Sequence, residues 1–278
     1  MTITGPVGSF SFNDIESSSF GLICKSVSRP ILPAAKLKRV DMPGASGVFD
    51  FPNTEYSNRP ITMRITYLSA DFEAMRINAR LIAGWLSQPT WCKLVINDEP
   101  DLYYLAKVAA ETNMAALFTA GQADIVFDCL PFAYSDTGIT EVLNDLTDSY
   151  NNVFTFTNPG TKTIDYRCPE GSQSIISVVG TWSSLVITIT TPEDTGVILC
   201  YYKAQNASPH PTLEIDNIDM TVHLITGQGP NDWTNEFGAL TSGMDTFVPI
   251  YAGENVWTIE GADVNLDSIG VEYVPLWL

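Results

Sequence analysis

The sequence predicts a mainly β protein with one α-helix, made of an N-terminal β domain and a C-terminal β-sandwich of the jelly-roll type. Three observations support this fold class. Short apolar stretches with a period of two recur between Gly, Pro, Asn and Asp residues, one segment alone has a helical period, and the charge changes abruptly near residue 136. We therefore predict an N-terminal domain at residues 1–135 and an acidic sandwich at residues 136–278.

The helical segment lies near residues 70–88. Asp71 and Glu73 suit the positive end of a helix dipole, and Pro89 marks the end of the segment. The apolar residues recur at spacings of three and four, which predicts one buried stripe against a sheet: Phe72, Met75, Ala79, Ile82 and Leu86.

Strands surround this helix in the N-terminal half. Residues 61–67 alternate apolar and polar side chains, which predicts a strand with one packed face. Residues 91–96 and 102–109 flank a turn at residues 97–101 and predict a hairpin, and residues 120–131 predict a further strand.

The second half reads as about ten short strands separated by turn residues, the pattern of a two-sheet sandwich. Residues 136–152 are polar and turn-rich, which predicts a boundary between the domains. Within this boundary, residues 141–146 are compatible with a short helix.

The charge distribution excludes several functions. The net charge of −18 splits into 11 − 13 = −2 for residues 1–135 and 3 − 19 = −16 for residues 136–278. Nucleic-acid binding requires clustered Lys and Arg, and the second half has only Lys162, Arg167 and Lys203. We expect no sequence-specific nucleic-acid binding. The N-terminus has no signal-peptide pattern and the chain has no long apolar run, so we expect neither secretion nor membrane insertion.

No motif predicts catalysis or a cofactor. The 5 cysteines are far apart and form no Cys-x-x-Cys pair, which favours buried free thiols, and His210 and His223 lack a third metal ligand at a known spacing. The stretch from Asp263 to Asp267 imitates a calcium loop but has Ser268 where the turn needs glycine. Carboxylate pairs such as Glu214 and Asp216 are expected by chance among 32 acids. We therefore expect no enzyme, no metal and no cofactor.

Aromatic residues of the second half leave a binding function open. The rings of Trp182, Trp233 and Trp257 could stack on sugars, as in lectin-like sandwiches, or could fill the core or a subunit contact. This makes a carbohydrate-binding module the alternative function, and a glycan-active hydrolase a more remote one.

The stretch from Ser28 to Leu68 carries a family resemblance. Pro43-Gly44-Ala-Ser-Gly47, then Tyr56-Ser-Asn-Arg59 and an alternating strand, precede one helix, and a later strand ends in Pro131-Phe-Ala-Tyr134. In these features the chain resembles the distal tail proteins of long-tailed, siphovirus-type phages. At the level of architecture, the second half is similar to the galectin-like second domain that many of those proteins carry.

The resemblance implies a structural component of the virion, located at the tail tip and assembled in the host cytoplasm. It implies a hexameric ring that joins the tail tube protein to the hub, tail-associated lysin or fibre protein, anchors receptor-binding or baseplate proteins, and leaves a central channel for DNA. The residues that we expect at the assembly interface are Lys38, Arg39, Asp41, Pro43, Gly44, Gly47 and Arg59.

Overall fold

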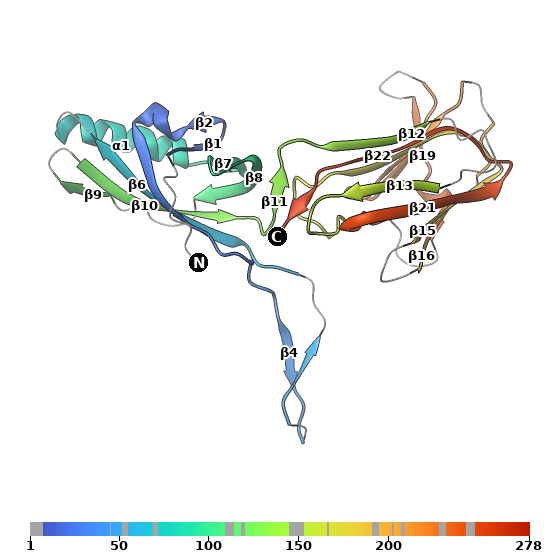
Figure 1. Ribbon diagram of the computed structural model, residues 1–278, viewed down its shortest axis with the longest axis horizontal. Helices are drawn as coiled ribbons and strands as arrows, with labels where there is room; N and C mark the ends of the chain where they lie inside the picture. The colour runs from blue at the N-terminus through green and yellow to red at the C-terminus, as the bar shows by residue number, and fades with distance from the viewer. Residues whose placement is uncertain are drawn as a thin grey trace. The chain divides into compact units, whose positions relative to one another are not determined.

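The computed structural model divides the chain into two compact units, Met1–Tyr134 with Leu278, and Ser135–Trp277. The residues that it describes are 8–44, 46–51, 55–68, 72–108, 114–117, 120–144, 153–165, 167–190, 195–201, 203–206, 209–227, 232–242 and 248–278. Each unit is mainly antiparallel β-sheet, and α1 (Phe72–Leu86) is the one α-helix among the described residues (Figure 1). The predicted fold class, mainly β with one helix, is confirmed.

Unit 1 is built on one large antiparallel sheet. The strand order is β2-β1-β7-β8-β10-β6-β3, with β9 paired to β10 and β11 paired to β8. The elements of the unit are β1 (Phe10–Phe12), β2 (Ile15–Glu16), the 3-10 helix η1 (Ser17–Phe20), β3 (Leu22–Ser28), β4 (Lys38–Asp41), β5 (Val48–Phe51), β6 (Arg59–Leu68), α1, β7 (Cys92–Ile96), β8 (Glu99–Val108), β9 (Met114–Leu117), β10 (Ala120–Cys129) and β11 (Ala133–Ser135).

Helix α1 packs on this sheet through three residues of its predicted apolar stripe and one further residue; Ala79 of the stripe is half-buried, and the Phe72 side chain lies outside the described part of the structure. Met75, Ile82 and Leu86 are buried, as the helical period predicts. Trp85 is also buried: its indole Nε1 donates a hydrogen bond to the Phe12 carbonyl oxygen at 2.9 Å, and its ring stacks on Phe10 at 5.8 Å between centroids. The core of unit 1 therefore lies between α1 and the sheet.

Unit 2 is a two-sheet sandwich. One sheet has six strands in the order β12-β22-β14-β17-β18-β19, and the other has five in the order β13-β21-β15-β16-β20. The elements are β12 (Ile139–Asn144), β13 (Val153–Asn158), β14 (Ser174–Thr181), β15 (Ser184–Thr190), β16 (Thr195–Tyr201), β17 (Thr212–Asp216), β18 (Thr221–Ile225), β19 (Trp233–Asn235), the 3-10 helix η2 (Phe237–Ala239), β20 (Leu240–Ser242), β21 (Gly253–Ala262), β22 (Asn265–Tyr273) and β23 (Leu276–Trp277).

The sandwich core comes from strict alternation along the strands. In β14, every second residue from Ser174 to Gly180 is buried, and β17 and β18 alternate in the same way. The two sheets meet through aromatic side chains: the Phe156 ring lies 6.0 Å from the Tyr273 ring, and the Tyr273 hydroxyl donates to the Thr157 carbonyl oxygen at 3.0 Å. The alternation read from the sequence thus reflects one shared core.

The short helix considered for residues 141–146 is wrong for its described part. Ile139–Asn144 form β12, which pairs with β22 from Tyr273 to Ser268 at the edge of the six-stranded sheet. Backbone hydrogen bonds to a distant strand outweigh the weak local helix preference of so short a segment. The predicted boundary segment therefore contributes a strand to the sandwich.

Candidate assembly interface

The described residues 34–44, 46–51 and 55–57 form a hairpin that we call the arm. Its strands β4 and β5 pair only with each other, from Lys38 opposite Phe51 to Asp41 opposite Val48. The pairing continues at its base, where the Lys36 amide donates to the Glu55 carbonyl oxygen at 3.0 Å and the Ser57 amide donates to the Ala34 carbonyl oxygen at 2.8 Å. In Figure 1 the arm is a ribbon that runs separately from the other strands of unit 1.

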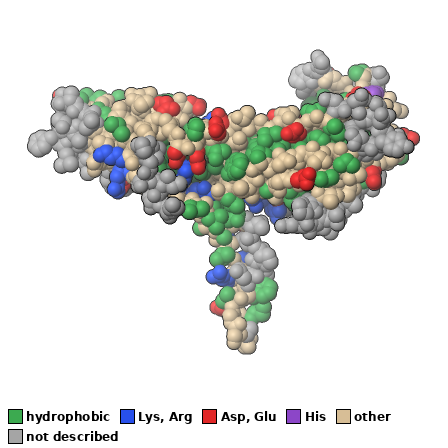
Figure 2. All heavy atoms as spheres, in the orientation of Figure 1, with side chains coloured by type: hydrophobic (Ala, Val, Ile, Leu, Met, Phe, Trp, Pro, Cys, Tyr) green, Lys and Arg blue, Asp and Glu red, His purple; other side chains and the backbone are tan. Residues whose placement is uncertain are grey.

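The arm exposes apolar side chains on both faces. Val40 and Phe49 are opposite each other on one face and are 50% and 45% exposed, whereas Val48 on the other face is 51% exposed. Figure 2 shows hydrophobic side chains along the arm, with Lys and Arg side chains beside them. Further exposed apolar residues lie along the arm and before it: Ile31, Leu32, Leu37 and Met42.

Six of the seven residues expected at an assembly interface lie together on the arm. Lys38, Arg39 and Asp41 are exposed on β4, and Pro43, Gly44 and Gly47 lie in the loop that joins β4 to β5. The two glycines have φ angles of 84° and 94°, in the region that side chains disfavour. Among the described residues, an added Cβ would meet nothing within 4 Å at either position. Glycine is therefore favoured there by the backbone conformation and not by lack of space.

Arg59 does not belong to this surface. Its side chain lies inside unit 1, with only 2% of the residue exposed, and its guanidinium lies 5.7 Å from the centre of the Tyr104 ring. Alternate residues of a strand point to the same face, so Arg59 on β6 faces the core together with the buried Ile61 and Met63. The guanidinium is therefore buried, and its Nε and Nη2 atoms have no hydrogen-bond partner among the described residues.

The structure separates the three tryptophans predicted to stack on sugars. Trp182 and Trp257 are 2% and 0% exposed, so this prediction is wrong for both. Trp257 packs edge-on against both Phe154 and Phe156 in the core, because its strand β21 turns every second residue inward. Trp233 is 47% exposed on the edge strand β19 and remains available for stacking.

The other polar candidates engage neighbouring residues. His210 pairs with Asp267 of the calcium-like stretch, with 2.7 Å between Nδ1 and Oδ2, and the His223 ring contacts Trp233 at 4.3 Å. Asp263, at the start of that stretch, accepts a hydrogen bond from the Ser183 hydroxyl at 2.7 Å. The described residues contain no group of three His, Cys, Asp or Glu side chains that could hold a metal ion.

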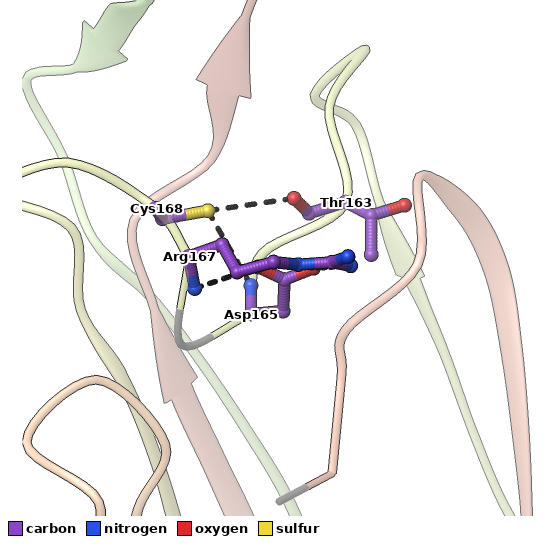
Figure 3. A network of polar contacts seen from close by, with 4 residues as sticks. All are labelled: Thr163, Asp165, Arg167 and Cys168. Atoms are coloured by element: carbon purple, nitrogen blue, oxygen red, sulfur yellow. Dashed lines mark hydrogen bonds and ion pairs between the residues drawn. The ribbon is translucent and has the colours of Figure 1, made fainter. Parts of the chain in front are cut away.

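Cys168 illustrates how the cysteines are held. Its thiol donates to the Thr163 carbonyl oxygen at 3.5 Å and accepts from the Asp165 amide at 3.4 Å, while Arg167 pairs with the Asp165 carboxylate (Figure 3). Burial is the largest effect on this thiol and raises its pKa to about 11, so it stays protonated at neutral pH. The described cysteines Cys24, Cys92, Cys129 and Cys168 are free.

Sequence reasoning missed the apolar residues of the arm. Val40 and Phe49 were not predicted as interface residues, although they carry much of its exposed apolar surface. A usable signal was present, since apolar residues flank both sides of the Pro43-Gly44 turn with no neighbouring strand of their own.

No described helix is long and apolar enough to cross a membrane.

Comparison with known proteins finds a family similarity for the part of the chain that includes the arm. Residues 15–129, which include the arm, match the phage tail protein RIFT-related domain. This part of the chain is therefore similar to a phage tail protein domain. The fold of the chain also matches the crystal structure of the Dit protein of phage SPP1, with a TM-score of 0.72, 11% sequence identity, and coverage of 97% of this chain and 99% of that one. No curated protein matches the sequence significantly.

These matches confirm the resemblance to distal tail proteins at the level of the tail domain and the fold. The SPP1 protein is described as a paradigm of the hub adsorption apparatus in phages that infect Gram-positive bacteria. Because the structural match covers nearly the whole chain, both units follow a Dit-like fold.

Proposed function

We propose that this protein is a distal tail protein whose copies close into a ring at the end of the phage tail tube, with a central channel for DNA. The phage tail domain at residues 15–129 and the Dit fold support this role. The number of six copies comes from the family resemblance. The ring lies at the tail tip of the virion after assembly in the host cytoplasm.

The arm is the observation that carries this proposal. A two-stranded hairpin is marginally stable in water by itself, and this one leaves Val40, Val48 and Phe49 about half exposed. Apolar surface of this kind, rimmed by charged residues, is typical of a protein–protein contact. We infer that the arm is covered by another copy of the chain in the assembled ring.

A ring follows from this asymmetric contact. An arm on one copy that binds a different surface on the next copy makes a head-to-tail interface, and such an interface closes into a ring when the rotation allows. The charge distribution favours contacts through the N-terminal half, which has a net charge of 11 − 13 = −2, over contacts through the second half with its net charge of 3 − 19 = −16.

The ring would act as a platform between several proteins. Its partners are the tail tube protein on one side and the hub, tail-associated lysin or fibre protein on the other, with receptor-binding or baseplate proteins attached. Its mechanism is geometric, because closure of the ring buries the arms and fixes the channel between the tube and the tip.

The test is the oligomeric state of the full chain in native mass spectrometry and negative-stain images, with and without the tail tube protein. The variant Val40→Asp/Phe49→Asp places two charges on the arm. Ile77→Asp/Leu81→Asp is the matched control, because these residues on α1 are 53% and 56% exposed. We expect six-copy rings for the wild type and the control, and monomers for the arm variant.

A wild-type chain that stays monomeric even with the tube protein would overturn the ring. Rings that persist in the arm variant would refute the role of the arm while leaving the ring intact.

A further inference from the structure

Strand β13 is an edge strand of the five-stranded sheet in unit 2 (Figure 1). It pairs with β21 along its whole length, Val153–Asn158, and with no other described strand. An edge strand turns about half of its backbone N–H and C=O groups away from its one neighbour. Among the described residues, the backbone of β13 makes one further hydrogen bond, which the Thr157 carbonyl oxygen accepts from the Tyr273 hydroxyl. The other outer backbone groups of β13 are therefore available to a second strand.

The other strands at the ends of the three larger sheets are protected against such pairing. β2, β19 and β20 have three residues or fewer. β3 carries the exposed Lys25 and a bulge between Cys24 and Ser26. β12 carries the exposed Glu141. Short length, charged side chains and bulges keep edge strands from joining other chains. β13 has six uncharged residues in a regular ladder and shows none of these devices.

The side chains of β13 anchor the strand on one face and leave an uncharged surface on the other. Phe154 and Phe156 are both 4% exposed and pack edge-on against Trp257 in the core. Val153 and Thr155 are exposed on the opposite face. β-Branched side chains favour an extended backbone and pack well against cross-strand neighbours. The edge is therefore already in the conformation that an added strand requires.

The surroundings of β13 determine which charges an added strand can carry. Residues 136–278 have a net charge of 3 − 19 = −16, and the exposed Glu254 on β21 lies opposite Thr157. Asp and Glu side chains of an added strand would be repelled, whereas Lys and Arg would be attracted. Beside Val153 and Thr155, uncharged side chains fit best.

We propose that the free edge of β13 binds an extended segment of another protein. The segment adds a sixth strand to the five-stranded sheet through backbone hydrogen bonds, places uncharged residues beside Val153 and Thr155, and carries Lys or Arg at its ends. Binding of this kind takes its affinity from the backbone and its specificity from alternate side chains. The site does not depend on ring formation, because β13 lies in unit 2 and the arm lies in unit 1.

The experiment uses the full chain and hydrogen–deuterium exchange mass spectrometry of the segment Val153–Asn158. The probe is the peptide acetyl-Lys-Thr-Val-Thr-Val-Thr-Lys-amide at about 1 mM. A second peptide has the same side chains, but every backbone nitrogen between its two Lys residues is methylated, so that it cannot donate to the edge. A third peptide has Glu in place of both Lys residues.

The matched variants are Thr155→Lys and Thr188→Lys. Thr155→Lys places a charge on the edge strand, as natural edge strands do to prevent pairing. Thr188→Lys places the same charge on the same face of the sheet, but on β15, which is separated from β13 by β21. Circular dichroism verifies that each variant is folded, and the comparison of the three peptides on the wild type does not depend on either variant.

We expect the Lys-ended peptide to slow exchange in Val153–Asn158 about tenfold, as a Kd of about 0.1 mM would give. The methylated peptide should have no effect, and the Glu-ended peptide should protect less. Thr155→Lys should lose most of the protection, whereas Thr188→Lys should keep it.

The proposal is overturned if the Lys-ended peptide leaves the exchange unchanged, or if the methylated peptide or the variant Thr155→Lys gives the same protection. Slow exchange of Val153–Asn158 in the wild type without peptide would also overturn it. In that case the edge is covered by the chain itself if the rate is independent of protein concentration, and by a second copy if exchange slows as the concentration rises. The oligomeric state, measured separately, tests the proposed function alone.

Discussion

The arm and the sandwich are both antiparallel β-structure, but they differ in how far their apolar side chains are buried. In the sandwich, Trp257, Ile259 and Ile269 are almost completely buried by residues of the same unit. In the arm, Val40 and Phe49 are about half exposed although they occupy regular ladder positions. The sandwich therefore buries its apolar residues within its own unit, whereas the arm leaves apolar residues exposed within the chain.

This difference separates stability from assembly. Changes in the sandwich core should be measured as a loss of folding free energy, and changes in the arm as a loss of contacts between copies. The comparison is informative only if the two effects can be varied independently.

The largest effect on stability is expected for Trp257→Ala. The side chain is completely buried and packs against Phe154 and Phe156, and its truncation should lower the free energy of unfolding by about 3–5 kcal/mol. Val153→Ala, on the exposed side of the same sheet, should stay within about 0.5 kcal/mol of the wild type. Urea unfolding followed by circular dichroism measures both. Equal unfolding midpoints for the two variants would contradict the burial of Trp257.

The next effect concerns the loop of the arm. Gly47 and Gly84 both have free space for a Cβ, but only Gly47 has a positive φ, at 94°. Gly47→Ala should strain the loop by about 1–2 kcal/mol and reduce the fraction of rings. Gly84→Ala lies within α1 and should stabilise the helix by up to about 1 kcal/mol without affecting rings. Native mass spectrometry distinguishes the two. A loss of rings in both variants would mean that the arm loop has no special role.

The sequence predicted the elements that follow from a local hydrophobic periodicity. It missed the arm, whose apolar residues lie outside any core of the chain. The helical stripe of Met75, Ile82 and Leu86 and the alternation of residues 61–67 are local, and both agree with the observed burial except at Thr66, which is 6% exposed. The arm hairpin was not predicted, because its pairing encloses no core. Strand phase could have corrected two errors, since Trp257 shares its phase with the buried Ile259, and Arg59 with the buried Ile61.

The division into domains at residues 1–135 and 136–278 stays a prediction as regards independent folding. The two compact units describe contacts, whereas independent stability is a thermodynamic property. The near-neutral first half and the acidic second half differ in net charge by 16 − 2 = 14 units, which is why composition alone indicated a boundary.

A smaller effect is expected at Arg59, which is buried without hydrogen-bond partners for Nε and Nη2. Because an unpaired buried donor costs about 1–3 kcal/mol, Arg59→Met should leave the unfolding midpoint unchanged or raise it. The pKa of Tyr104 gives a second measure: burial raises it and the Arg59 charge opposes this, so the variant should raise it further. Ultraviolet titration of the phenolate follows this change. A clear loss of stability in Arg59→Met would show that the guanidinium has a stabilising partner in the folded protein.

The smallest effect is expected at an exposed pair on the sheet of unit 1. Arg64 on β6 donates to Asp124 on β10 through Nε at 2.8 Å and Nη2 at 3.0 Å, and these hydrogen bonds hold the pKa of Asp124 below its ordinary value of 3.8. A carboxyl group with a lowered folded-state pKa contributes stability above its unfolded pKa, and this contribution disappears as the pH falls through the folded value. Arg64→Gln should therefore bring the Asp124 pKa back toward 3.8 and lower stability slightly at neutral pH but not at pH values below both pKa values. Carbon NMR titration of the Asp124 carboxyl group measures the shift. Ring formation should be the same in this variant as in the wild type, because the pair is satisfied within one chain; a loss of rings would place this part of the sheet, and not the arm alone, in the contact between copies.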